Sequence, residues 1–115
     1  MGLAIVTDRH PPSAAIEAWI DTGFTGDVVL PLPVITELGL TQSGSVDAVL
    51  ADGSQIELAT YSCRIRWLDE ERHLEVIAND GEVPLVGVGL LWGSQLCIDY
   101  VNHTVSLAPA SKTTT

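Results

Sequence analysis

The sequence predicts an all-β protein, arranged as a barrel or a sandwich. Short apolar stretches of strand character recur along the chain, and turn residues separate them at intervals of about 8–12 residues. Asp52-Gly53 stands between two of these stretches, and Asp-Gly is a strong signal for a tight β-hairpin. The strongest helical signals lie in one short segment, 31–39, which is long enough for only about two turns.

Three strands and the helix are expected in the N-terminal part of the chain. The helix at 31–39 has Pro33 in its first turn and Gly39 at its C-terminal cap, both favoured positions. A turn at 8–13 contains Pro11-Pro12, which excludes a helix there. The expected strands are 2–7, an apolar and buried strand at 14–20, and a short strand at 27–30.

The Asp52-Gly53 hairpin is expected to have long arms, at 45–51 and 54–68. Along the second arm the apolar residues change from even to odd positions near Ala59-Thr60. Because a strand can exchange its two faces only through a bulge or bend, the tip half should project from the body. A projecting hairpin is either decoration or a flap over a site.

In the C-terminal part of the chain, the sequence predicts a charged turn, a strand, a glycine-containing apolar run and a last hairpin. Its segments are the turn at 69–72, the strand at 74–78, a loop at 79–82, the apolar run at 83–93, and hairpin arms at 95–100 and 104–107. We therefore expect one domain over 1–108, followed by a disordered polar tail at 109–115.

Composition excludes several classes of partner. The chain has 15 acidic and 5 basic residues, a net charge of −10, and the bases form no dense patch. Binding to nucleic acid or to anionic membranes is therefore not expected. No apolar run reaches the ~20 residues of a membrane helix, and a cytoplasmic location is expected. Cys63 and Cys97 lie in apolar runs and are expected to be buried free thiols.

Several kinds of chemistry can be set aside. There is no Gly-x-Ser-x-Gly elbow, and the three histidines lie far apart in predicted turns, so no metal site is expected. Gly87-Val88-Gly89 lacks the spacing of a dinucleotide loop, and close backbone packing explains these glycines better. No cofactor is expected. The three tryptophans are interpreted as core or interface residues.

Asp21-Thr22-Gly23 is the main candidate for a catalytic site. It places a carboxylate at the end of an apolar strand, where a charge is costly unless hydrogen bonds support it. The tripeptide alone is more typical of an ordinary turn. Two carboxylates held close together could share a proton and activate a water, but the chain supplies only one in such a setting. Two-fold symmetry would bring a second Asp21 to face the first.

The sequence around this motif resembles the retroviral-type (retropepsin-like) aspartic peptidases, in particular their small bacterial branch. Ile20-Asp21-Thr22-Gly23-Phe24-Thr25-Gly26 resembles their catalytic loop, and the Asp52-Gly53 hairpin stands where their flap belongs. The resemblance spans about residues 14–107, and its other segments are 28–31 with the following helix, the second signature at 84–91, and the strand at 96–100.

This resemblance implies a closed β-barrel subunit with a flap and one or two short helices. It implies an aspartic endopeptidase that acts on a peptide or protein substrate as a homodimer, with one Asp21 from each chain. Thr22 would hydrogen-bond across the two-fold axis, and Gly23 would let the substrate backbone approach. The flap or substrate-binding residues would be Ala51, Asp52, Gly53 and Ser54, and Val86 and Gly87 would pack beside the catalytic loop.

The chain departs from the retroviral pattern at a pair of charges. Retroviral members carry further acids where this chain has Thr25 and Gly26, and an arginine where it has Val88. Both partners are absent together, which is coherent because a lone buried charge is costly. The acidic charge of two subunits should raise the pKa values of the Asp pair, so we hypothesise an acidic optimum.

Two other functions are compatible with the sequence. One is a non-catalytic dimerisation or peptide-binding module on the same fold, since the flap lacks the glycine-rich tip of viral members. The other is a small β-barrel that binds an apolar ligand without Asp21, which would be monomeric.

Overall fold

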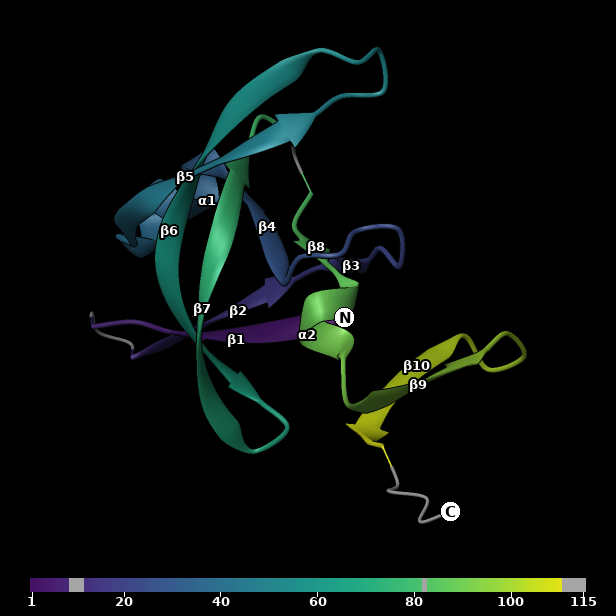
Figure 1. Cartoon of the computed structure of the whole chain (residues 1–115). Helices are drawn as coiled ribbons and strands as arrows, with labels where there is room; N and C mark the ends of the chain where they lie inside the picture. The colour runs from purple at the N-terminus through teal and green to yellow at the C-terminus, as the bar shows by residue number, and fades with distance from the viewer. Residues whose placement is uncertain (9–11, 82, 111–115) are drawn as a thin grey trace.

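The computed structural model describes residues 1–8, 12–81 and 83–110, and within them the chain is all-β with two short helices (Figure 1). Residues 9–11 of the expected turn at 8–13, Glu82 of the expected loop and 111–115 of the expected tail lie outside the described residues. The strands are β1 (Gly2–Val6), β2 (Ser13–Glu17), β3 (Trp19–Ile20), β4 (Val28–Pro31), β5 (Thr41–Val49), β6 (Gln55–Trp67), β7 (Glu70–Asn79), β8 (Leu85–Val86), β9 (Ser94–Asp99) and β10 (Thr104–Pro109). The helices are α1 (Leu32–Leu38) and α2 (Val88–Leu91).

Eight strands form one sheet, and β9 and β10 form a second sheet of two strands. The order in the large sheet is β2-β1-β6-β7-β4-β8-β3, and β5 pairs with β6 off this path. The length of β6 explains the branch: its residues 55–62 pair with β5, and its residues 64–66, near the end of the strand, pair with β1. The sheet curves around the core, while the β5–β6 hairpin extends beyond it (Figure 1).

The expected closed barrel is not formed by the described strands. The two ends of the large sheet are β2 and β3, which do not pair with each other. They are successive parts of one segment, separated only by Ala18, so they follow one another in line and cannot lie side by side. The hydrogen-bonded ladder is therefore open, and its two edges are joined through the backbone at Ala18.

The expectation of one buried strand at 14–20 is also wrong. The Ala18 backbone bonds to Met1, with its N–H 2.7 Å from the Met1 oxygen, whereas the Trp19 N–H turns to the Pro84 oxygen at 2.9 Å. This change of partner divides the segment into β2 and β3. Successive residues of a strand point to opposite faces, and those of β2 alternate between exposed and half-buried. The Trp19 side chain, on β3 at the other end of the sheet, is 70% exposed.

The core lies inside the curve of the large sheet. Its fully buried large side chains come from β1, β4, β6, β7, β8 and both helices: Leu3, Ile5, Val28, Leu30, Ile35, Ile65, Val76, Val86 and Leu90. Each such side chain stabilises the fold by about 1.5–3 kcal/mol relative to an exposed one. Trp67 belongs to this core as expected, but Trp92 is 82% exposed. Cys63 is buried as predicted, whereas Cys97 is exposed because it lies on the outer face of β9.

Two predictions from local sequence are confirmed: the helix with its glycine cap, and the irregularity in the long hairpin. Helix α1 has proline in its first turn and is capped at its C-terminal end by Gly39, whose φ of 69° is the left-handed conformation that glycine favours. The β5–β6 hairpin has an irregularity where the sequence changes phase. Its register shifts between Gln42 and Gly44, opposite Thr60 and Tyr61, and the Ser43 and Thr60 hydroxyls lie 3.1 Å apart.

Two boundaries differ from expectation in the second half of the chain. The expected charged turn at 69–72 is only Leu68 and Asp69, with φ of 49° and 67°, and β7 already begins at Glu70. Such a two-residue turn has positive φ at both positions and continues the strand twist. The expected disordered tail starts too early, because Pro109 pairs with Ser94 in the last hairpin and the Ala110 N–H bonds to the Gly93 oxygen.

Candidate functional site

Asp21 stands where the chain leaves β3, and its carboxylate is fixed by the turn that follows. Its N–H donates to the Val86 oxygen at 2.9 Å, and its own oxygen accepts from the Phe24 N–H at 3.1 Å. The Gly23 N–H donates to Asp21 Oδ1 at 2.9 Å. Asp21 is half-buried, whereas Thr22 and Gly23 are exposed. The carboxylate therefore has a defined orientation at the surface.

Strand β8 lies between β3 and β4, so the loop at 21–27 that joins these two strands passes around it. The β8 strand runs parallel to β3, with Ile20 opposite Val86, and antiparallel to β4, with Val28 opposite Val86. The structure thus brings Val86 and Gly87 beside Asp21 and its loop, as the resemblance implied for the segment 84–91. Residues about sixty-five positions apart in the chain become neighbours through this insertion.

Backbone hydrogen bonds fasten the 21–27 loop to the segment after β8. The N–H groups of residues 87, 88 and 89 donate to the oxygens of Asp27, Phe24 and Gly26, at 2.9, 2.8 and 3.0 Å respectively. All three N–H groups therefore donate to acceptors within the protein. Because backbone bonds do not depend on side-chain rotamers, this clamp gives the loop that carries Asp21 a rigid support.

The glycines at 87 and 89 are explained by close backbone approach. A Cβ on Gly87 would collide with the Gly26 oxygen and the Phe24 ring, and would lie 2.6 Å from the Phe24 oxygen. A Cβ on Gly89 would lie 2.7 Å from Asp27 Oδ1 and 2.9 Å from the Gly26 oxygen. The prediction that these glycines serve packing is confirmed.

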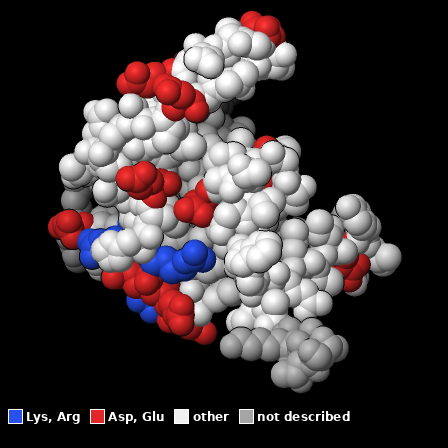
Figure 2. All heavy atoms as spheres, viewed as in Figure 1, with Lys and Arg blue, Asp and Glu red and all other residues white. Residues whose placement is uncertain are grey.

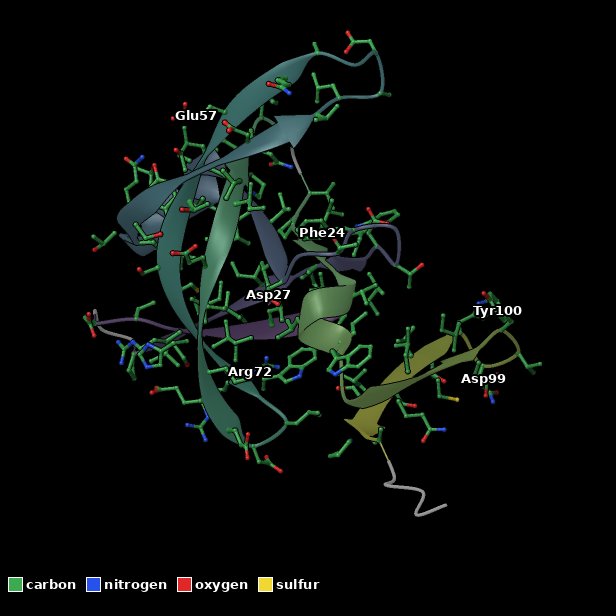
Figure 3. The ribbon with its side chains drawn as sticks, viewed as in Figure 1. Phe24, Asp27, Glu57, Arg72, Asp99 and Tyr100 are labelled. Carbon is green, nitrogen blue, oxygen red and sulfur yellow. The ribbon has the colours of Figure 1, made fainter. Side chains whose placement is uncertain are left out.

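Sequence reasoning missed Phe24 and Asp27 as parts of the site. The Phe24 ring also packs against Gly26, where a Cβ would lie 2.5 Å from its Cζ. Figure 3 shows Phe24 on the loop and Asp27 beside the start of α2. Phe24 is the only phenylalanine of the chain and comes directly after the Asp-Thr-Gly motif. This position in the sequence could have identified it as part of the site.

The expected flap residues form the tip of the β5–β6 hairpin. Asp52 Oδ1 accepts from the Ser54 N–H at 2.9 Å and from the Ser54 hydroxyl at 2.6 Å, and the Gly53 N–H donates to the Leu50 oxygen at 2.9 Å. These two bonds from Ser54 hold the pKa of Asp52 below its usual value. Ala51 is exposed in the same turn. The tip is thus ordered by its own hydrogen bonds.

The two faces of this hairpin differ in polarity. Val46 pairs with Leu58 and Ala48 with Ile56 on one face, whereas Asp47 pairs with Glu57 on the other. In Figure 1 the tip lies above β8 and the 21–27 loop. The arrangement of a projecting arm with one apolar face suits contact with an extended chain.

The three basic residues that the structure describes lie away from the hairpin tip. Arg64, Arg66 and Arg72 all lie on β6 and β7, near the turn that joins them, and Figure 2 shows blue atoms only in this lower region of the visible face. Arg64 pairs with Asp8 and lies 3.9 Å from Glu71, and Arg72 donates to the Leu90 oxygen at 3.5 Å. The tip and the 21–27 loop carry acids and no base.

The isolated chain does not enclose Asp21. A surface hollow of about 500 Å³ lies elsewhere, between the end of β1, the C-terminal end of α1 and the middle of β6 and β7, and Asp21 does not line it. In the part of the chain that the structure describes, no group of three or more His, Cys, Asp or Glu side chains could hold a metal ion. Within the same residues, neither helix is long and apolar enough to cross a membrane.

Comparisons of the chain with protein-family models, with curated proteins and with solved structures give no significant match.

Proposed function

We propose that the chain is an aspartic endopeptidase of retropepsin-like type, active as a homodimer in which each copy contributes Asp21. The observation that carries the proposal is the support of this carboxylate. Asp21 Oδ1 accepts from Gly23 N–H at 2.9 Å, and the loop behind it is clamped to the segment after β8 by three backbone bonds. The resemblance of the sequence to that family also supports it. Catalysis by paired carboxylates requires this fixed placement of their oxygens.

The proposed chemistry uses two Asp21 side chains and a water. Two carboxylates a few Å apart share one proton, because both cannot remain ionised. The ionised member takes a proton from the water as its oxygen attacks the peptide carbonyl carbon. The protonated member gives its proton to the carbonyl oxygen, which leaves a neutral tetrahedral gem-diol. The member that took the proton from the water then gives it to the amide nitrogen, and the other member takes back a hydroxyl proton. The C–N bond breaks, and an amine and a carboxylic acid are released.

Other described features have defined parts in this proposal. Thr22 is exposed beside Asp21 and is available to bond across the two-fold axis. Gly23 leaves space for the substrate backbone. The tip at residues 51–54 would close over the peptide and exclude water, with the apolar face of the hairpin toward the substrate. Because one chain leaves Asp21 open, the second copy would also complete the groove.

The substitution Asp21→Asn tests the proposal. Asn keeps an oxygen that can accept from the Gly23 N–H, so the fold should be retained, but it cannot serve as the base. We expect cleavage of a diverse peptide pool near pH 5 to fall by at least about a thousandfold, with unchanged dimerisation. Mass spectrometry of the products and sedimentation measure the two properties.

Asp80→Asn is the matched control, because it removes the same charge from an exposed loop position. It should leave cleavage unchanged. A wild-type chain that dimerises and binds peptides but cleaves none between acidic and neutral pH would instead support a non-catalytic binding module. Cleavage that survives in Asp21→Asn would contradict the proposed mechanism.

A further inference from the structure

The hollow of about 500 Å³ that Asp21 does not line has its origin in the pairing of β6. Strand β6 keeps β7 on one edge over residues 60–67, but its other edge changes partner. That edge pairs with β5 as far as Ser62, opposite Thr41, and with β1 from Arg64 onward, opposite Val6. Figure 1 shows β5 along the upper part of β6 and β1 along its lower part. The two strands therefore separate at Cys63, and we call the hollow at this point the fork pocket.

The fork pocket has an apolar floor and a polar rim. Leu38, Leu40 and Leu74 line it, are half-buried and pack on the main core. Cys63, which pairs with Leu74, also lines it and is 4% exposed. The exposed side chains around it are Asp8, Thr41, Ser62, His73 and Glu75. An apolar floor under a few polar groups, with a volume in the range of about 300–1,000 Å³, is typical of a small-molecule site.

The charges around the fork pocket disfavour an anionic ligand. Among the described residues that line it, Arg64 is the one lysine or arginine. Arg64 already pairs with Asp8 and lies 3.9 Å from Glu71, and His73 Nε2 lies 4.0 Å from the same Glu71 side chain. Glu75 adds a further acid to the rim, and the whole chain has a net charge of −10. An anion would therefore meet a repulsive field without a free basic partner.

The remaining polar groups favour an uncharged head on the ligand. Thr41 and Ser62 are paired across β5 and β6, and both are exposed at the rim. Each hydroxyl can donate and accept a hydrogen bond, as an alcohol can. A cationic head would have Glu75 as its partner, but an ion pair with an exposed carboxylate contributes little. Affinity must then come mainly from the apolar floor.

We propose that the fork pocket binds a small aliphatic molecule of the alcohol class. Its alkyl chain packs on Leu38, Leu40 and Leu74, and its hydroxyl lies at the rim beside Thr41 and Ser62. This site uses no part of the Asp21 loop, so the inference is independent of the proposed function.

Titration of the folded chain with 1-octanol, followed by amide NMR spectra, tests the site. We expect saturable shifts at residues 38–41, 62–64 and 73–75, and none at residues 21–23. Because each buried methylene tightens binding about fourfold, 1-octanol should bind at least about tenfold more tightly than 1-hexanol. Octanoate should bind at least about fivefold more weakly than 1-octanol, because its charge is repelled.

Substitutions on α1 and just after it provide a matched pair. Leu40→Trp places an indole in the pocket and should weaken binding of 1-octanol at least about tenfold. Leu32→Trp makes the same change at a position that is 43% exposed and outside the pocket, and it should bind as wild type does. Thr41→Trp narrows the rim from an exposed position without entering the core, and it should also weaken binding.

Circular dichroism checks that each variant folds, and Thr41→Trp decides the outcome if Leu40→Trp does not. Shifts that do not saturate, equal affinities for 1-hexanol and 1-octanol, or wild-type affinity in folded Thr41→Trp overturn the inference. Octylamine that binds more than about tenfold more tightly than 1-octanol overturns the uncharged head. Asp21→Asn should bind 1-octanol as wild type does, so a chain that binds it but cleaves nothing supports this pocket and contradicts only the peptidase function.

Discussion

At the scale of single residues, the two cysteines show how the surroundings of a side chain change its exposure and its reactivity. Cys63 is 4% exposed within the core, and burial raises the pKa of its thiol from 9.0 to about 11. Cys97 lies on the outer face of β9 and is exposed. We therefore expect a thiol reagent to label Cys97 rapidly in the folded protein and Cys63 only after unfolding.

The raised pKa of Cys63 predicts a loss of stability in alkali. Below about pH 9 the thiol is neutral in both states, so it favours neither. As the pH rises through 9.0 toward 11, the unfolded thiol ionises while the folded one stays neutral, which favours the unfolded state. The free energy of unfolding should fall by on the order of 2 kcal/mol by about pH 11 from this group.

Urea unfolding from about pH 8 to about pH 10.5 measures this loss. Cys63→Ala should lower stability at every pH, through the small cavity it leaves, but should show a smaller alkaline decline than wild type. Cys97→Ala is the control and should retain the wild-type decline. Equal declines in all three proteins would contradict the assignment to Cys63.

At the scale of elements, the contact between the segment after β8 and the 21–27 loop is so close that it leaves no room for a Cβ at Gly87. Gly87→Ala places a Cβ against the Gly26 oxygen and the Phe24 ring, and backbone cannot move aside as a flexible side chain can. We expect the free energy of unfolding to fall by about 2–4 kcal/mol. Cleavage should fall as well, because the loop that holds Asp21 is displaced.

Gly2→Ala is the control for this substitution, since a Cβ at Gly2 meets no atom within 4 Å. Its stability in denaturant should stay within about 0.5 kcal/mol of wild type. A Gly87→Ala chain as stable as wild type would show that the two segments are not packed as described.

The elements also show which structural features a single sequence can predict. Local signals predicted α1 with its Gly39 cap, the tip at Asp52-Gly53 and the irregularity near Thr60, because each depends on residues close in sequence. The turn at Leu68 and Asp69 was misplaced, since a leucine rarely adopts a positive φ. The break at Ala18 depends on bonds to Met1 and Pro84, which no local pattern reveals.

The candidate site was predicted only in part for the same reason. The resemblance led us to expect Val86 and Gly87 beside Asp21, and the structure places these segments side by side. Two further contacts join segments that are distant in sequence: Phe24 packs against Gly87, and Asp27 lies close to Gly89. The alternation of apolar and polar residues along one strand could not indicate such contacts.

At the scale of the whole molecule, charge should control the proposed dimer. Two chains of −10 each repel one another as they approach, and salt screens this repulsion. We expect sedimentation to show dimerisation several-fold tighter at about 0.5 M than at about 0.05 M sodium chloride. Dimerisation that weakens with salt would indicate that ion pairs hold the interface.

The insertion of β8 between β3 and β4 has a consequence for biosynthesis. Strand β4 ends at Pro31 and β8 begins at Leu85, so a nascent chain has made both outer strands long before the one that separates them. Until residue 86 leaves the ribosome, β3 and one edge of β4 lack their partner, and the Asp21 N–H lacks its acceptor. The 21–27 loop can therefore acquire its native shape only after the chain has been synthesised through residue 86 and beyond.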